Sequence, residues 1–192
     1  MASFSSDLRS EGAARWYGIH TRHQHEASVA SILSNKGFKV FCPTYESVRQ
    51  WKDRSKKLSL PLFPGYVFLA DDVEKKLLIV STPGVCAILS FAGKPAVIPT
   101  SEIQALRRAT DYRFKLTPHP FLNTGDRLRV KSGPLAGTEG ILTRKKDIYR
   151  LVLSVEILGR SAAVEIDASL VERTSRPAGS TFLGAPEIVA PA

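Results

Sequence analysis

The run Pro61–Phe68 restricts the possible folds more than any other segment, because the strand that it opens has no polar face. A half-buried strand alternates apolar and polar residues. After the Pro64-Gly65 break, Tyr66 and Phe68 point to one side of a strand, and Val67 and Leu69 point to the other. We expect Val67 and Leu69 to pack under helices. The aromatic side then needs a cover of its own, from the same chain or from a partner.

The segments around this run predict the element order β-α-β-β-α-β, with a helix appended. Strands are expected at 16–20, 38–43, 66–69, 85–89 and 96–98, and helices at 26–36, 72–80 and 101–108. Asp72 is a candidate N-cap, and Ser101 with Gln104 forms a candidate capping box. This order predicts a ferredoxin-like split β-α-β domain, in which helices cover one face of an antiparallel sheet and leave the other open.

The second half of the chain changes character. Short β-branched stretches separated by glycine turns predict strands at 127–131, 140–143, 150–155 and 162–166, which is typical of a small SH3-like β-barrel. The fold class is therefore α+β. We expect five parts: a flexible leader (1–14), a first domain (15–110), a linker (111–124), a second domain (125–174) and a disordered tail (175–192).

Composition narrows the functional class. The 192 residues include 27 Lys+Arg against 18 Asp+Glu, and the resulting net charge of +9 favours a partner with phosphates or another acidic surface. Cys42 and Cys86 form no motif and indicate reduced cysteines in a cytosolic protein. No run has the length of a signal peptide or a membrane span, so we expect a cytoplasmic protein. No nucleophile-base pair, phosphate-cradling loop or metal cluster is evident, so we expect neither an enzyme nor a cofactor.

Two motifs occur in a specific order. Trp16-Tyr17 and Phe63-Pro64-Gly65-Tyr66-Val67-Phe68 precede the run Gly125–Gly140, which is followed by Ile157-Leu158-Gly159-Arg160. Over residues 15–174 this combination resembles the NusG family of transcription elongation factors, which have an NGN domain followed by a KOW domain. Arg22-His23-Gln24 replaces the aromatic-Ser-Gly turn of housekeeping members, which makes the chain similar to the RfaH-like, operon-specific antiterminators of the family.

The resemblance implies that the NGN domain binds the clamp helices of RNA polymerase. Its apolar pocket would comprise Phe63, Tyr66 and Phe68, with Trp16 in support, and aromatic anchors of this kind dominate interfaces. Ser81 and Thr82 match the position at which RfaH-like members touch the opposite side of the polymerase cleft. Two plain alternatives stay open: the aromatic residues are core residues, and the hydroxyls cap a turn.

Two basic segments are candidates for contact with non-template DNA or nascent RNA. The first is the turn after the first strand, with Arg22, His23 and His25. The second is the connector 49–57, where Trp51, Lys52 and Arg54 combine phosphate contact with base stacking. Solvated loops are the alternative for both. A zinc site at His20–His25 is disfavoured, because no fourth ligand falls at a convincing spacing.

The resemblance also implies a partner for the KOW domain, either the ribosomal protein NusE or Rho. The matching residues are Leu135, Ile157, Leu158, Gly159 and Arg160. Leu135 and Leu158 stand where the family often has aromatic residues, which weakens the case for Rho. We expect a monomer. A KOW-containing ribosomal or RNA-binding protein is the alternative function, and a KOW segment that refolds as a helical hairpin is the alternative fold, although the Val and Ile content of 151–157 favours strands.

Overall fold

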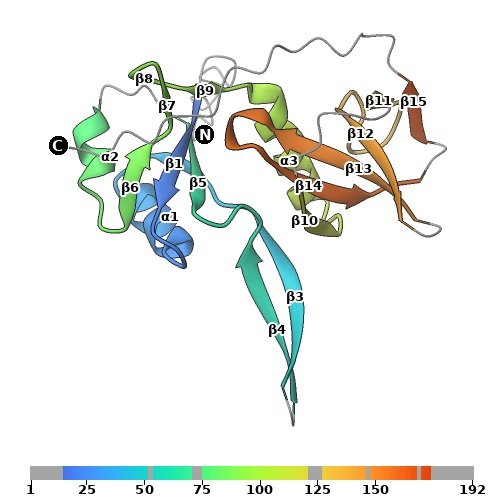
Figure 1. Ribbon diagram of the computed structural model, residues 1–192, viewed down its shortest axis with the longest axis horizontal. Helices are drawn as coiled ribbons and strands as arrows, with labels where there is room; N and C mark the ends of the chain where they lie inside the picture. The colour runs from blue at the N-terminus through green and yellow to red at the C-terminus, as the bar shows by residue number, and fades with distance from the viewer. Residues whose placement is uncertain are drawn as a thin grey trace, which may run out of the picture.

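The computed structural model describes residues 15–51, 54–70, 75–120, 127–145, 148–167 and 170–173. The predicted leader and tail, the Asp72 cap, Lys52 and Gly125 lie outside these residues. The chain forms two antiparallel sheets that lie on either side of helix α3, and a long hairpin projects away from both (Figure 1).

The N-terminal sheet has the predicted split β-α-β topology. Its order is β2-β5-β1-β6, and β9 also pairs with β1. The strands are β1 (Trp16–Thr21), β2 (Lys39–Phe41), β5 (Tyr66–Ala70), β6 (Val85–Ile88) and β9 (Val97–Ile98). The central pair β1 and β5 is antiparallel, with Gly18 opposite Phe68 and His20 opposite Tyr66. The prediction of an α+β, ferredoxin-like first domain is therefore confirmed.

Helices cover one face of this sheet. They are α1 (Glu26–Asn35) and the short α2 (Lys76–Val80). Val67 and Leu69 pack there with apolar residues of β1 and of both helices, namely Tyr17, Ile19, Val29, Leu33 and Ile79. The predicted packing of Val67 and Leu69 under the helices is confirmed, because alternate residues of a strand face opposite sides of the sheet.

The other face of the sheet is not open, and that expectation is wrong. It is covered by α3 (Thr100–Asp111) and by the C-terminal sheet, which share one apolar core with it. α3 packs against this core through residues three positions apart: Ile103, Leu106 and Ala109. The capping box expected at Ser101 and Gln104 is also wrong, since the N-cap residue is Pro99 and no side chain caps the helix.

The C-terminal sheet is six-stranded, with the order β10-β14-β13-β12-β11-β15. Its strands are β10 (Leu116–Pro120), β11 (Arg127–Val130), β12 (Glu139–Lys145), β13 (Ile148–Val155), β14 (Arg160–Glu165) and β15 (Val171–Arg173). A 3₁₀ turn, η2 (Glu156–Leu158), joins β13 to β14. Residues 148–165 thus form strands rather than a helical hairpin. β10 lies within the stretch expected to be an unstructured linker; its prolines are tolerated because it is an edge strand.

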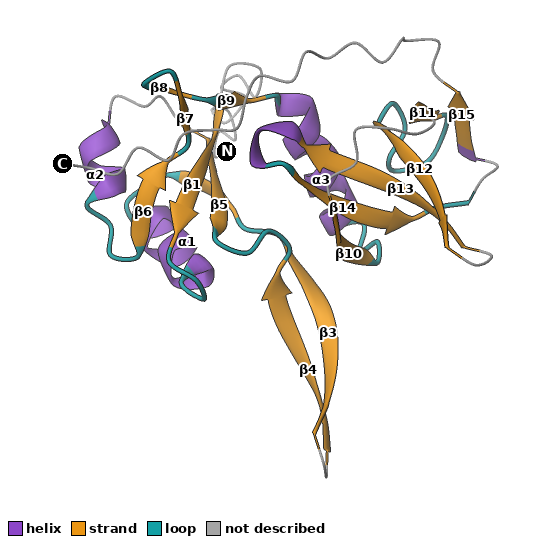
Figure 2. Ribbon diagram, in the orientation of Figure 1, coloured by secondary structure: helices purple, strands orange, loops and turns teal. Residues whose placement is uncertain are grey.

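The basic connector is not a loop. It lies within a two-stranded hairpin of β3 (Thr44–Trp51) and β4 (Arg54–Pro61), inserted between β2 and β5 (Figure 2). A smaller ribbon pairs β7 (Ser90–Phe91) with β8 (Lys94–Pro95). Within the described part of the chain, no helix is long and apolar enough to cross a membrane.

Candidate functional site

The sequence-predicted aromatic residues gather on the sheet face opposite α1. Trp16 and Phe68 lie on this face because they occupy same-side positions of β1 and β5. Phe63 meets Phe68 edge to face, with ring centroids 5.5 Å apart, and Tyr66 packs at the margin of the same core. Trp16, Phe63 and Phe68 are buried and Tyr66 is half-buried. We call these four residues the aromatic face.

A tight turn places Phe63 in this group although it precedes β5. Gly65 takes a φ of 81°, which glycine adopts without strain, and the Tyr66 N–H donates to the Phe63 carbonyl at 3.1 Å. The buried carboxylate of Glu26 on α1 accepts the Gly65 N–H at 2.6 Å. The turn at Pro64-Gly65 therefore directs Phe63 back onto the sheet.

The aromatic face is covered by the end of the C-terminal sheet, where residues 155–160 form the turn between β13 and β14. We call these residues the C-terminal tip. The Arg160 guanidinium carbon lies 5.3 Å from the centroid of the Tyr66 ring, within cation-π range. Val155 and Leu158 are buried in the same core as Phe68, and Ile157 packs against it. Four of the five residues predicted to bind a KOW partner thus belong to a tip that packs on the predicted polymerase site; the fifth, Leu135, is buried in the same core.

Gly18 leaves space for the side chain of Leu89, next to the C-terminal tip. A Cβ atom at position 18 would lie 2.6 Å from Leu89 Cδ1 and 3.5 Å from Leu158 Cδ2. Sequence inspection does not single out Gly18, because a glycine within a strand has several ordinary explanations. Gly159, at the tip itself, takes the left-handed conformation with a φ of 55° and caps η2.

Helix α3 makes two polar contacts with the C-terminal part of the chain that no local sequence pattern predicts. The Arg108 guanidinium donates to the Ala136 carbonyl at 2.9 Å and to Thr138 Oγ1 at 3.0 Å. The Glu102 carboxyl group faces Glu156 in the C-terminal tip. Burial, and secondarily the negative charge of Glu156, raise the pKa of Glu102 to about 8, although a hydrogen bond from the Glu156 backbone opposes the shift.

Ser81 and Thr82 directly follow α2, and their environments differ. Thr82 is buried, and its hydroxyl donates to the Leu78 carbonyl at 3.0 Å and accepts from Lys36 Nζ at 2.8 Å. Ser81 is exposed, with a longer hydroxyl bond of 3.4 Å to the same carbonyl. The geometry at Thr82 matches the plain alternative of a hydroxyl that caps a turn, whereas Ser81 remains accessible.

The turn after β1 lies beside the Pro83-Gly84 turn, because the Arg22 N–H donates to the Gly84 carbonyl at 2.8 Å. Arg22, His23 and His25 are all exposed there. Between them Gln24 takes a φ of 64°. The structure therefore brings the first group of predicted nucleic-acid residues close to Ser81 at one end of the sheet. No three His, Cys, Asp or Glu side chains gather into a metal-binding group in the described ranges.

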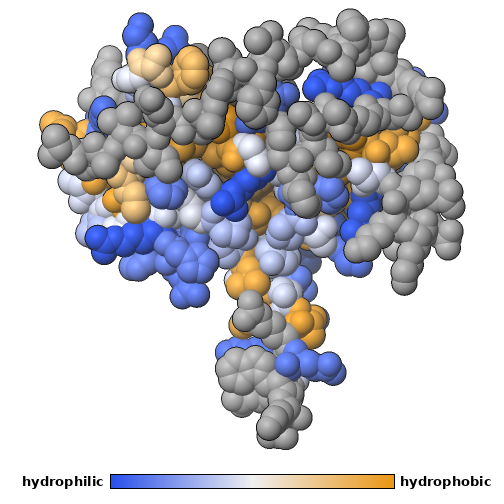
Figure 3. Space-filling view, in the orientation of Figure 1, coloured by the Kyte–Doolittle hydropathy of each residue, from blue (hydrophilic) through white to orange (hydrophobic). Residues whose placement is uncertain are grey.

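The second group of predicted nucleic-acid residues lies far from the first, on the hairpin. Trp51 pairs with Arg54 at its end, and Lys52, between them in the sequence, lies outside the described residues. Nearer the base of the ribbon, Arg49 and Lys56 occupy paired positions in the register. In Figure 3 apolar residues lie along the middle of the hairpin and hydrophilic ones lie further toward its tip.

Comparison with known proteins places the chain in a family. The family model described as "Transcription termination factor nusG" matches residues 14–107. The chain is 29% identical over 177 residues to the transcription termination/antitermination protein NusG of Staphylococcus carnosus, covering 84% of this chain and 97% of the relative. The NusG of Staphylococcus aureus strain Mu50 is 28% identical over the same shares. The solved structure "Domain interaction in Thermotoga maritima NusG" aligns at 24% identity with a TM-score of 0.49, covering 84% of this chain and 97% of that one. The chain belongs to the NusG family.

Proposed function

We propose that this protein is a non-enzymatic transcription elongation factor that binds RNA polymerase through the aromatic face and promotes processive elongation and antitermination. Membership of the NusG family supports a role in transcription. The observation that carries the binding site is that the aromatic face packs against the C-terminal tip and α3, and not against α1 and α2. The C-terminal tip belongs to the second sheet and can be exchanged for a partner, whereas α1 and α2 belong to the first domain and cannot.

In this proposal the protein has a closed state and an open state. In the closed state the aromatic face and the C-terminal tip cover each other, so neither is free to bind. Opening exposes Tyr66 and its neighbours to the polymerase clamp helices. The same opening frees Ile157, Leu158 and Arg160 for NusE or Rho. Polymerase binding then shifts the equilibrium toward the open state, because the polymerase binds only that state.

The nucleic-acid contacts belong to the same proposal. The exposed Arg22, His23 and His25 would meet non-template DNA, and the hairpin around Trp51 and Arg54 would meet DNA or nascent RNA. Ser81 would touch the other side of the polymerase cleft. We place the protein in the cytoplasm as a monomer that acts on particular operons.

Tyr66→Ala tests the polymerase site. Tyr66 is the half-buried member of the aromatic face, so its removal should disturb the fold less than removal of Phe63 or Phe68. An aromatic anchor at an interface contributes about 2 kcal/mol, so retention on RNA polymerase should fall about 30-fold. Read-through in run-off transcription past terminators should fall with it. Tyr112→Ala is the matched control, because Tyr112 is 62% exposed at the end of α3.

Two results would count against this function. If Tyr66→Ala and Tyr112→Ala retain polymerase equally well, the aromatic face is not the binding site. If the wild-type protein changes read-through on no template but binds ribosomal RNA, and Tyr66→Ala leaves that binding intact, the ribosomal or RNA-binding alternative is favoured instead.

A further inference from the structure

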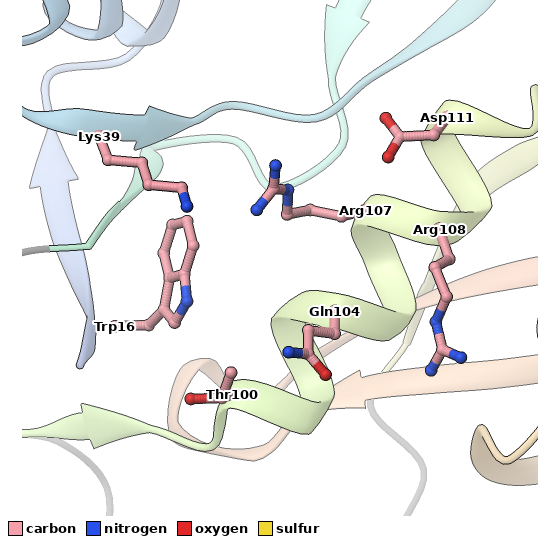
Figure 4. A pocket seen from close by; sticks show the side chains of 7 residues that line it. All are labelled: Trp16, Lys39, Thr100, Gln104, Arg107, Arg108 and Asp111. Atoms are coloured by element: carbon pink, nitrogen blue, oxygen red, sulfur yellow. The ribbon is translucent and has the colours of Figure 1, made fainter. Parts of the chain in front are cut away.

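The two ends of the aromatic face are fixed in different ways. At one end Trp16 lies between two strands, paired with Ala70 of β5 and with Ile98 of β9. Figure 4 shows its indole across a cavity of about 310 Å³ from helix α3. At the other end Phe63 precedes β5, and Tyr66 is the first residue of that strand. Strand pairing therefore positions Trp16, whereas the turn between Phe63 and Tyr66 decides where those two rings lie.

The backbone of Gly65, inside this turn, is held at both of its polar groups by the connection between β1 and α1. The Gly65 N–H donates to Glu26 Oε1 at 2.6 Å. The Gly65 carbonyl accepts from the Thr21 N–H at 2.9 Å. A third bond, from the Tyr66 N–H to the Phe63 carbonyl at 3.1 Å, closes the turn itself. Of these three bonds, the one to Glu26 is made by a side chain, so a substitution can remove it.

Glu26 is buried at the start of α1, with 2% of its surface exposed. A buried carboxylate is costly unless hydrogen bonds and a favourable field compensate for the loss of water. The Gly65 N–H supplies such a bond, and the first turn of a helix is the end at which the helix dipole favours a negative charge. A hydrogen bond to an ionised acceptor is also stronger than a neutral one. The side chain is therefore suited to holding a backbone group in one place.

The bond between Gly65 and Glu26 does not depend on the C-terminal tip, because both residues belong to the first domain. In the closed state Tyr66 is also contacted by Arg160, 5.3 Å from its ring centroid. Opening of the proposed kind removes that contact and leaves Tyr66 with first-domain neighbours, such as the His20 ring at 5.3 Å. In the open state the Glu26 bond thus carries a larger share of the restraint on the turn.

We propose that Glu26 is a positioning residue for polymerase binding, which holds the 63–66 turn of the open state in the geometry that the polymerase binds. The proposal rests on the proposed function, because it takes the aromatic face as the polymerase site. A turn that is ordered before binding lowers the entropic cost of association. Without the Glu26 bond, Gly65 is free to adopt other conformations, and the Phe63 and Tyr66 rings move with it. Glu26 acts through these rings and does not itself contact the polymerase.

The test measures retention of the full-length protein on RNA polymerase for substitutions of Glu26. Glu26→Ala removes the acceptor, and we expect retention to fall about tenfold. Glu26→Gln keeps an oxygen at the same reach without the charge, so retention should stay within about threefold of the wild type. Glu26→Asp keeps the charge but withdraws it from Gly65, so it should lose retention as alanine does, and it replaces the alanine variant if that variant does not fold. Hydrogen exchange at the Gly65 amide should be faster in Glu26→Ala and Glu26→Asp than in Glu26→Gln.

Two control variants separate positioning from a general loss of stability or charge. Val29→Ala truncates a fully buried side chain of α1 that packs on the sheet face opposite the aromatic face. It should destabilise the domain by leaving a cavity and yet be retained like the wild type. Glu46→Ala removes an exposed carboxylate of β3 and should leave retention unchanged. Urea unfolding measures the stability of every variant.

The positioning role is wrong if Glu26→Ala is retained as well as Glu46→Ala, or if Glu26→Gln loses as much retention as Glu26→Ala. It is also wrong if Val29→Ala loses retention in proportion to its stability, because the effect at Glu26 is then that of a weakened fold. Tyr66→Ala, measured alongside, separates this proposal from the proposed function. If Tyr66→Ala loses retention and Glu26→Ala does not, the positioning role alone is overturned; if neither loses retention, both proposals are.

Discussion

Glu102 is a carboxyl group held where its charge is disfavoured. Its Oε2 atom is buried without a hydrogen-bond partner among the described residues, and Glu156 of the C-terminal tip adds a second negative charge. Its pKa rises from the ordinary 4.5 to about 8 as a result. At a pH between these two pKa values, Glu102 is protonated in the packed state but deprotonated in an open or unfolded state. The packed state therefore loses stability as pH rises from about 4.5 to about 8, and below that window Glu102 adds no cost.

Glu102→Gln should remove this dependence, because glutamine keeps the acceptor for the Glu156 N–H without the charge. Above pH 8 we expect the variant to be more stable than the wild type by on the order of 1 kcal/mol, a figure that allows for solvent screening. At the acid end of the window the two proteins should be equal. Urea unfolding across the window measures the difference, with Glu172→Gln, at an exposed position of β15, as the control. Parallel pH profiles for wild type and Glu102→Gln would contradict the prediction.

Single residues differ in how far the sequence predicts them. Strand alternation alone predicts that Tyr66 and Val67 face opposite sides of the sheet, and in the structure they do. The burial of Glu102 and the contacts of Arg108 do not follow from local pattern, because both depend on a sheet formed by residues far along the chain. On the helix itself these side chains have the pattern of an ordinary solvated face.

Among the elements, the hairpin of β3 and β4 is where sequence interpretation failed most clearly. The basic run around Trp51 looks like a solvated loop, because charge conceals the alternation of a strand. The strand register shows this alternation. The positions of Trp51, Arg54, Arg49 and Lys56 fall on one side of the ribbon, and the paired positions of Lys57 and Val48 fall on the other. Lys56 is exposed on the first of these sides, so we expect an anionic partner to contact the hairpin there.

Lys56→Glu tests whether this side of the hairpin binds nucleic acid. Lys56 and Lys57 are adjacent and exposed but lie on opposite sides of the ribbon, so Lys57→Glu is a matched control. We expect Lys56→Glu to weaken oligonucleotide binding about tenfold and to reduce the dependence of log K on log salt by about one. Lys57→Glu should have a smaller effect on both. Fluorescence anisotropy over a series of salt concentrations measures them. Equal losses in the two variants would mean that the hairpin has no preferred binding side.

At the scale of the whole molecule, the sequence predicts both sheets but not their contact. The strand order of the N-terminal sheet and the strands of residues 127–166 follow from alternation, glycine turns and helix signals. The closed arrangement depends on the contact of Leu158 and Arg160 with the aromatic face. The residues of that face lie far away in the sequence, and no local pattern encodes such a contact. The aromatic face and the C-terminal tip were each predicted as a surface for a different partner; in the structure each is the other's cover.

If the closed state limits polymerase binding, a substitution that weakens the cover should increase binding. Leu158→Asp places a charge in the apolar core between the tip and the aromatic face, which favours the open state because an unpaired buried charge is costly. We expect the variant to bind RNA polymerase at least about fivefold more tightly than the wild type, since a closed population lowers the apparent affinity by the open fraction. Leu77→Asp is the control, as Leu77 is 81% exposed on α2. Small-angle scattering should show a larger radius of gyration for Leu158→Asp alone. An expanded protein that binds polymerase no better than the wild type would show that closure does not limit access to the aromatic face.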